Sequence, residues 1–246
     1  RVLPGMQAAF VEIGLSRTAF LHVNDIIFPK KMDAQNEQPL INELLHEGQM
    51  ITVQVMKDML GSKGARLTTD LSIPSRYLVY MPFGEHIGIS QRIESEAERE
   101  RLKILTRLIR DEHSDSLKGG VIVRTAAEGI SEEELRQDMS YLIKLWQHIN
   151  EKKIKIQTPT LIYEELPLYQ RIIRDLVIQD VAKIYIDSRE TLGKIIDFVR
   201  EFVPNAEDKL EHYPGEKPLF ELYNVEDDLQ KALSRKVLLK DRKSVV

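Results

Sequence analysis

Gly-Gly-Val-Ile-Val-Arg-Thr-Ala-Ala-Glu-Gly, residues 119–129, is the stretch on which the interpretation of this chain depends. A glycine pair precedes a β-branched run, residues 121–123, which predicts a buried strand. Arg124 and Thr125 follow at the end of the strand, where the backbone is held rigidly. Their guanidinium and hydroxyl groups are donors that fit phosphate oxygens. The stretch is therefore a candidate phosphate site. The alternative is that Arg124 pairs with a surface carboxylate and that Thr125 begins a turn.

The composition is that of an ordinary globular protein long enough for two or three small domains. The formal net charge of −4 gives no global basic field, so any contact with nucleic acid has to be a local patch. The absence of cysteine excludes a disulfide framework and thiolate zinc sites within these residues. No run approaches the ~20 apolar residues of a membrane span, and no signal peptide is evident, which predicts a cytoplasmic protein without a membrane segment. The start at Arg1 and the uncapped end at Val246 lead us to expect an excerpt of a longer protein.

Residues 1–70 read as short strands joined by glycine turns, which predicts a small antiparallel barrel. The expected strands are residues 7–14, 18–23, 50–56 and 65–71. Phe10 and Phe20 lie on adjacent strands, and His22 shares the face of Phe20. If Phe10 lies on that face too, the three rings form a stacking platform for bases, with Lys63 on a nearby loop for backbone charge. The alternative is that both phenylalanines belong to the core.

The remaining residues alternate between helices and strands. Between 71 and 169 we expect strands at 77–82, 87–90 and 121–123, an amphipathic helix at 94–110, and a helix to about 153 that begins with the capping box of Ser131 and Glu134. Between 170 and 246 we expect helices at 169–176, 189–203 and 225–235, and strands at 182–187 and 236–240. The six histidines have no metal-ligand spacing, and Asp187 after a strand is a single carboxylate. No pattern favours nucleophilic catalysis.

The first part of the chain resembles an S1 RNA-binding domain, which is an OB-fold barrel. The similarity rests on the segments Ala-Ala-Phe-Val-Glu-Ile-Gly (8–14), Ala-Phe-Leu-His-Val (19–23) and Glu-Gly-Gln (47–49). It implies that Phe10 and Phe20 are the aromatic pair that contacts RNA. It also implies that another strand would precede Arg1, so that the first barrel strand is missing.

The middle of the chain resembles the 5′-sensor of the ribonuclease E/G family, with its nearest match in the G branch. The matching segments, in family order, are 63–69 (Lys-Gly-Ala-Arg-Leu-Thr-Thr), 75–79 (Ser-Arg-Tyr-Leu-Val), 88–94 (Gly-Ile-Ser-Gln-Arg-Ile-Glu) and 122–126 (Ile-Val-Arg-Thr-Ala). The resemblance implies that Arg124 and Thr125 hold the 5′-monophosphate of an RNA. Backbone amides near residues 77–79 would complete the pocket: Val79 matches one of these positions, and Ser75 stands where some members have glycine. Arg92 is an auxiliary charge.

A terminal monophosphate carries close to two negative charges, which aligned donors around a guanidinium can enclose. A triphosphate would be too large for a tight pocket, and a hydroxyl end would leave the donors empty. The fold class implied is a multidomain α+β chain. Its parts are an S1-type OB-fold barrel (1–70), a mixed α/β 5′-sensor region (71–169) and part of an RNase H-like α/β region (170–246).

The resemblance further implies a bacterial endoribonuclease that acts on single-stranded RNA in rRNA processing and mRNA decay. Its Mg²⁺ would be held by aspartates of a DNase I-like domain, and Zn²⁺ would link the subunits of a homodimer or homotetramer, with all these ligands beyond residue 246. We therefore expect this chain to recognise an RNA end without cleaving it. Two alternatives stay open: a stand-alone S1-type RNA-binding module without 5′-end sensing, and a purely architectural piece.

Overall fold

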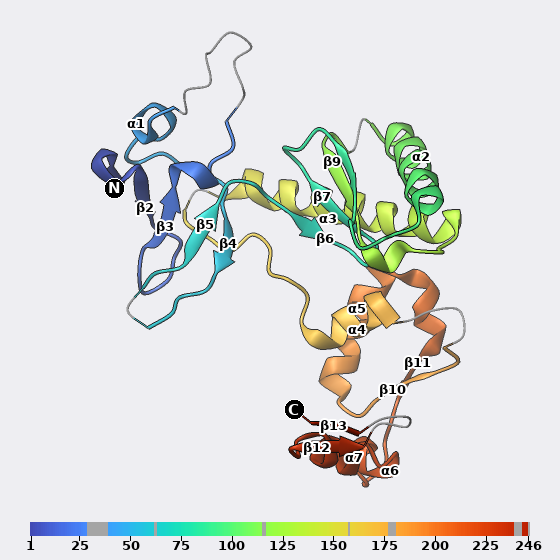
Figure 1. Cartoon of the computed structure of the whole chain (residues 1–246). Coiled ribbons are helices and arrows are strands. Elements are labelled where there is room, and N and C mark those ends of the chain that lie inside the picture. Colours follow the sequence, from blue (N-terminus) through green and yellow to red (C-terminus); the bar gives the residue numbers. More distant parts are fainter. Residues whose placement is uncertain are drawn as a thin grey trace. The chain divides into compact units, whose positions relative to one another are not determined.

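The computed structural model describes residues 1–28, 39–61, 63–114, 117–156, 158–176, 181–238 and 243–245. Its contacts divide the chain into two compact units, Arg1–Glu165 and Leu166–Val246, whose elements are labelled in Figure 1. Within the described ranges, no helix combines the length and the apolar character needed to cross a membrane.

The first unit begins with a five-stranded sheet in the order β1-β2-β3-β5-β4. Its strands are β1 (Val2–Leu3), β2 (Ala8–Val11), β3 (Ala19–His22), β4 (Gln54–Lys57) and β5 (Arg66–Thr68). The short helix α1 (Ile41–Leu44) lies between β3 and β4 in sequence. The sheet packs around small and aliphatic side chains, among them Ala9, Ala19, Leu21, Ile41, Leu45, Ala65 and Leu67.

Two features of this sheet differ from the sequence-based expectation. The prediction that all pairs are antiparallel is wrong at one position, because β3 and β5 run parallel with Phe20 opposite Arg66. The strand β4, which precedes β5 in sequence and runs antiparallel to it, brings the chain back to the end of the sheet from which β3 starts. At the edge where a strand was expected to be missing, Val2 and Leu3 pair antiparallel with β2.

A four-stranded sheet follows, in the order β6-β7-β9-β8, with two long helices. Its elements are β6 (Ile73–Pro74), β7 (Leu78–Met81), β8 (Ile87–Ile89), α2 (Glu96–Glu112), β9 (Gly120–Val123) and α3 (Glu132–Lys155). The central strand β9 runs antiparallel to β7 and parallel to β8. A side chain at Gly120 would place its Cβ 2.7 Å from the carbonyl oxygen of His86, so the strand needs glycine at this close approach.

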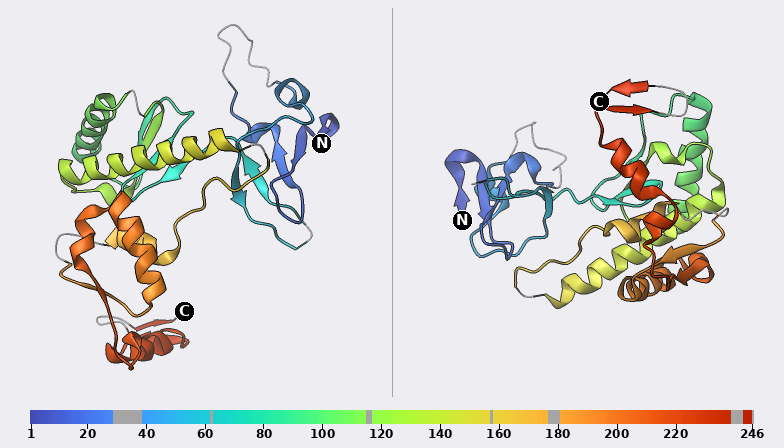
Figure 2. Two further views of the ribbon diagram at one scale, coloured as in Figure 1. Left: turned by 180° about the vertical axis from the view of Figure 1, so that it is seen from behind. Right: turned by 90° about the horizontal axis from the view of Figure 1, so that it is seen from below.

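The helices α2 and α3 contact each other and the sheet, and α3 runs along one sheet face in the views of Figures 1 and 2. The sheet side chains on this covered face are Leu78, Tyr80, Val121 and Val123, and all four are buried. Tyr80 meets Trp146 of α3 edge-on at a centroid distance of 5.6 Å. The predicted capping box is confirmed: Ser131 accepts from the amide of Glu134, whose carboxylate accepts from the amide of Ser131.

The second unit has an α/β alternation, as the sequence predicted. Its elements are α4 (Leu168–Leu176), β10 (Ile184–Ile186), α5 (Arg189–Phe202), β11 (Leu210–His212), α6 (Leu219–Leu222), α7 (Val225–Ala232), β12 (Lys236–Leu238) and β13 (Lys243–Val245). The strands β10 and β11 are parallel neighbours, and α5 connects them and contacts both. Ser188 caps α5 by accepting from the amide of Thr191. β11 and α6 were not predicted, because each is too short to show a period.

Candidate phosphate and RNA-binding sites

Arg124 leaves the end of β9 in an extended conformation, and its amide donates to the carbonyl oxygen of Tyr77 at 2.8 Å. Because side chains alternate along a strand, Arg124 shares a face with Ile122, whereas Val121 and Val123 are buried beneath α2 and α3. Arg124 is therefore exposed on the face of the sheet that these helices leave open.

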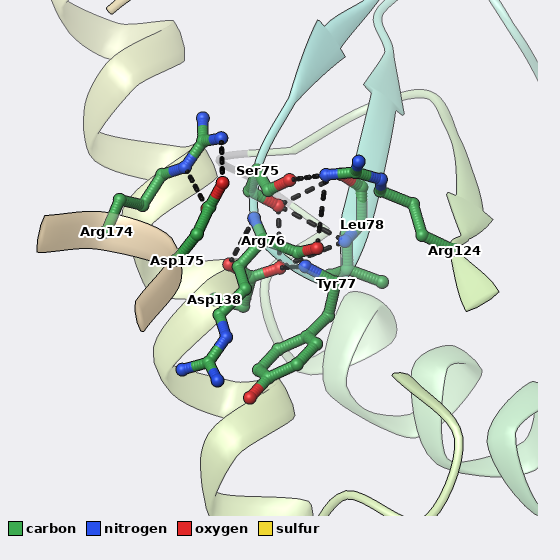
Figure 3. Close-up of polar contacts among 8 residues, drawn as sticks. All are labelled: Ser75, Arg76, Tyr77, Leu78, Arg124, Asp138, Arg174 and Asp175. Carbon is green, nitrogen blue, oxygen red and sulfur yellow. Dashed lines mark hydrogen bonds and ion pairs between the residues drawn. The ribbon is translucent and has the colours of Figure 1, made fainter. Parts of the chain in front are cut away.

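The guanidinium of Arg124 is anchored on one side, as Figure 3 shows. Its Nη1 donates to the carbonyl oxygens of Ser75, at 2.5 Å, and Arg76, at 3.1 Å. Among the residues that the structure describes, no carboxylate pairs with it, so the interpretation of Arg124 as a surface ion pair does not hold there. The Nε and Nη2 donors find no protein acceptor in the same residues. The fork is thus held in place with donors left for a ligand.

Thr125 lies beside this arginine and begins a 3₁₀ turn, Thr125–Ala127, so the turn that was the alternative interpretation is present. Its Oγ1 lies 3.0 Å from the Oγ of Ser90. The amide of Ser90 donates to the carbonyl oxygen of Val123, which ties the segment after β8 to the end of β9. Two hydroxyls and the guanidinium therefore gather at one end of the sheet. The amide of Arg92 lies 3.4 Å from the Ser90 Oγ, and the Arg92 side chain is exposed.

Val79 and Ser75 occupy different positions relative to this end of the sheet. Val79 lies in the middle of β7 opposite Ile122, half-buried and on the same open face as Arg124. The Ser75 side chain is buried, and its Oγ lies within hydrogen-bond distance of the Leu78 carbonyl oxygen and of Asp138 Oδ2. The link of Ser75 to the site is its carbonyl oxygen, which accepts from Arg124.

Asp138 was missed by the sequence analysis. It projects from α3 and is buried, with 7% of its surface exposed. Its Oδ2 accepts from the amides of Tyr77, at 2.8 Å, and Leu78, at 3.0 Å, and its Oδ1 accepts from the amide of Arg76, at 3.1 Å. A signal was present in the sequence: this carboxylate lies one residue before Met139 in the apolar stripe of the helix, where an unpaired charge would be costly.

A second anchor holds the chain after the 3₁₀ turn. Arg101 of α2 forms a two-point ion pair with Glu98, with both N–O distances at 2.7 Å, and also donates to the carbonyl oxygen of Ile130. Glu98 in turn accepts from the amide of Gly129 at 2.8 Å. The hydrogen bonds from Arg101 and then from the Gly129 amide lower the pKa of Glu98 to about 2. Residues 124–130 are therefore fixed at both ends.

The predicted aromatic platform lies on the five-stranded sheet. Phe10 is directly opposite Phe20 in the β2–β3 ladder, with ring centroids 6.0 Å apart, and His22 follows at 6.4 Å from Phe20. Ala19 and Leu21, which alternate with them, are fully buried. The three rings therefore share the outer face of the sheet, and Phe10 is 38% exposed.

Lys63 belongs to a turn in which its amide donates to the carbonyl oxygen of Leu60. A Cβ at Gly64 would lie 2.2 Å from the carbonyl oxygen of Thr18, so this turn passes close to the start of β3. The exposed ammonium thus comes from a turn next to the strand that carries Phe20.

Across the described ranges, no three histidine, aspartate or glutamate side chains lie together in an arrangement that could hold an ion.

Comparison with known proteins gives consistent matches. Residues 72–246 match the model of the ribonuclease E/G family. The chain is 51% identical to ribonuclease G of Salmonella typhimurium and 50% identical to ribonuclease G of Escherichia coli K12, in each case over 98% of this chain and 49% of the relative. It is 34% identical to ribonuclease E of a Nostoc species, over 96% of this chain and 34% of that protein. The chain spans about half the length of the ribonuclease G relatives that it matches.

Proposed function

Because the chain belongs to the ribonuclease E/G family, as its sequence motifs indicated, we propose that it is the RNA-binding and 5′-end-sensing part of a single-strand-specific endoribonuclease. One observation carries the proposal. The guanidinium of Arg124 is anchored through Nη1 on two backbone carbonyls, with Thr125 beside it and its remaining donors open.

The chemistry of this end of the sheet suits a terminal phosphate. A 5′-monophosphate offers three oxygens and close to two negative charges, which a preorganised arginine can bind with two donors at once. Anchoring one side of the fork in advance reduces the side-chain entropy that binding would cost. In the proposed complex Arg124 and Thr125 contact the phosphate, Val79 contributes its backbone position, Arg92 adds charge, and Ser75 supports Arg124 through its carbonyl.

The row of Phe10, Phe20 and His22 would bind the RNA chain away from its end. Bases stack on exposed aromatic faces with little sequence preference, and Lys63 would attract the phosphate backbone. The presence of these rings on the outer face of a five-stranded sheet supports an S1-type OB fold for residues 1–70.

The activity of the whole protein stays a prediction from the family. It comprises cleavage of single-stranded RNA in rRNA processing and mRNA decay, in the bacterial cytoplasm and as a homodimer or homotetramer. Among the described residues, no group of three histidine, aspartate or glutamate side chains is arranged to hold an ion, and the chain has no cysteine, so these residues do not fit the Mg²⁺ and Zn²⁺ sites that the family implies. The ligands of both ions are expected beyond residue 246, and we propose that this chain alone does not cleave RNA.

The direct test compares two RNA oligonucleotides of one sequence, one with a 5′-monophosphate and the other with a 5′-hydroxyl. The monophosphate form should bind this chain more tightly, as measured by fluorescence anisotropy with the label at the 3′ end. Equal affinities would reject 5′-end sensing and leave the alternative of an S1-type RNA-binding module, which the outward-facing Phe10 and Phe20 favour. No salt-dependent binding of either RNA would leave only an architectural role.

A further inference from the structure

Asp138 and Arg124 hold the same two peptide groups from opposite sides. The first group joins Ser75 to Arg76: its carbonyl accepts from Arg124 at 2.5 Å, and its N–H donates to Asp138 at 3.1 Å. The second joins Arg76 to Tyr77: its carbonyl accepts from Arg124 at 3.1 Å, and its N–H donates to Asp138 at 2.8 Å. Figure 3 shows the carboxylate and the guanidinium on either side of this segment.

This arrangement follows from the geometry of a trans peptide, whose N–H and C=O bonds point in opposite directions. A carboxylate that collects the N–H groups of two successive peptides turns both carbonyls away from itself. In this chain both carbonyls meet at Nη1 of Arg124. The orientation of the guanidinium is therefore determined by a residue on α3 that does not touch it.

A carboxylate is suited to this task for two reasons. It is an acceptor only, with room for several donors, and here four donors converge on it: the amides of Arg76, Tyr77 and Leu78 and the hydroxyl of Ser75. Its charge also polarises the peptides between it and Arg124, which strengthens the carbonyl as an acceptor for the guanidinium.

We propose that Asp138 is a positioning residue of the 5′-monophosphate site and that it determines how strongly the chain distinguishes a 5′-monophosphate from a 5′-hydroxyl. The inference rests on the proposed function of that site. Asp138 contacts no part of the RNA: it keeps the open side of the Arg124 fork at the place where the phosphate has to lie.

The test is the substitution Asp138→Asn, which keeps the shape but turns one acceptor into a donor. The measured quantity is the ratio of the dissociation constants of the 5′-hydroxyl and 5′-monophosphate RNAs, for variants whose circular dichroism and thermal unfolding show a folded chain. We expect the ratio to fall about tenfold, the effect of losing one hydrogen bond to a charged group. The control is Glu151→Gln on the same helix, an exposed carboxylate whose removal makes the same change in charge and should leave the ratio unchanged.

The outcomes separate the two proposals. A wild-type chain without preference for the monophosphate rejects the proposed function. The positioning role is overturned if the wild-type chain shows the preference and the folded Asp138→Asn variant keeps the same ratio. That ratio also stays the same if the substitution weakens binding of both RNAs equally. If Asp138→Asn does not fold, Asp138→Glu keeps the charge but displaces it by one methylene, and the ratio should still fall. A wild-type ratio in that folded variant would equally overturn the inference.

Discussion

The Nη1 atom of Arg124 lies 2.5 Å from the carbonyl oxygen of Ser75, although the two residues are 49 positions apart in the sequence. This bond joins the end of β9 to the segment before β7 and commits one edge of the guanidinium to the protein. Only the other donors are then available to a ligand, which gives the site a direction as well as a charge.

The first prediction concerns that charge. Arg124→Ala should weaken binding of 5′-monophosphate RNA by about 1.5–3 kcal/mol, because it removes a charged hydrogen-bond partner of the phosphate. Binding of 5′-hydroxyl RNA should change little. The measurement is a pair of anisotropy titrations, with Arg107→Ala as the control, since Arg107 is an exposed arginine of α2. A similar loss in both variants would indicate a general charge effect and contradict the prediction.

A second prediction tests the hydroxyl of Thr125. Thr125→Val keeps the β-branched shape and should weaken binding of the monophosphate RNA by about 1 kcal/mol through the loss of one donor. Ser90→Ala removes the neighbouring hydroxyl, which lies 3.0 Å away, and leaves Thr125 in place. If Ser90→Ala weakens binding less than Thr125→Val does, Thr125 is the donor to the phosphate. If Ser90→Ala weakens binding more, the donor is Ser90.

The aromatic row leads to a third prediction. Phe10→Ala and Phe20→Ala should each weaken single-stranded RNA binding by about 1–3 kcal/mol, the range for loss of a stacked base, whatever the 5′ end carries. Phe83 is a further exposed phenylalanine, at 50%, so Phe83→Ala is the matched control. An effect confined to the monophosphate RNA would contradict the prediction, because it would place the action of the row at the proposed phosphate site.

The acid stability of the first unit gives a fourth prediction. Arg101 and the Gly129 amide lower the pKa of Glu98 from 4.5 to about 2, so ionised Glu98 favours the folded state. This contribution is fully present above about pH 4.5 and is lost as the pH falls towards 2. The unfolding free energy of Glu98→Gln should therefore lie below that of the wild type near neutral pH and approach it in acid, as urea titrations at several pH values can measure. Glu100→Gln, an exposed neighbour on α2, should show no such convergence.

A fifth prediction concerns Gly120, the first residue of β9. Gly120→Ala should lower the unfolding free energy by about 1–3 kcal/mol, because the new Cβ would lie 2.7 Å from the carbonyl oxygen of His86 and the backbone would have to move. The Cβ of Gly88→Ala would lie 3.5 Å from Ile122, which is ordinary contact. Thermal unfolding of the two variants should show the loss for Gly120→Ala alone, and an equal loss in both would indicate a general intolerance of alanine in this sheet.

Much of this site could be read from local patterns. The β-branched run before Arg124 predicted a strand with the arginine at its end, and the strand is present as Gly120–Val123. The alternation of Ala19 and Leu21 with Phe20 did not predict which of the two faces of β3 points outward. In the structure Ala19 and Leu21 lie in the core, so Phe20 lies on the outer face.

The parts that escaped prediction depend on contacts between distant residues. Asp138 reaches the amide of Leu78 across 60 positions, and no local pattern says where a buried carboxylate finds its donors. The parallel pairing of β3 and β5 depends on which strands become neighbours in the sheet, which periodicity does not report. The strand Leu210–His212 has a partner, β10, but no sequence signal of its own.

The register between β7 and β9 also determines where the chain accepts changes of length. Leu78 lies opposite Val123 and Met81 opposite Gly120, so the position of Arg124 relative to Ser75 depends on the register of the whole ladder. One residue inserted within β7 would turn Val79 to the covered face and displace Ser75 by about 3.3 Å from Arg124. An insertion at Glu85, in the connection beyond the opposite end of β7, leaves that phase intact. A reporter peptide placed there would allow the proposed RNA binding to be measured without changing the register that positions Arg124.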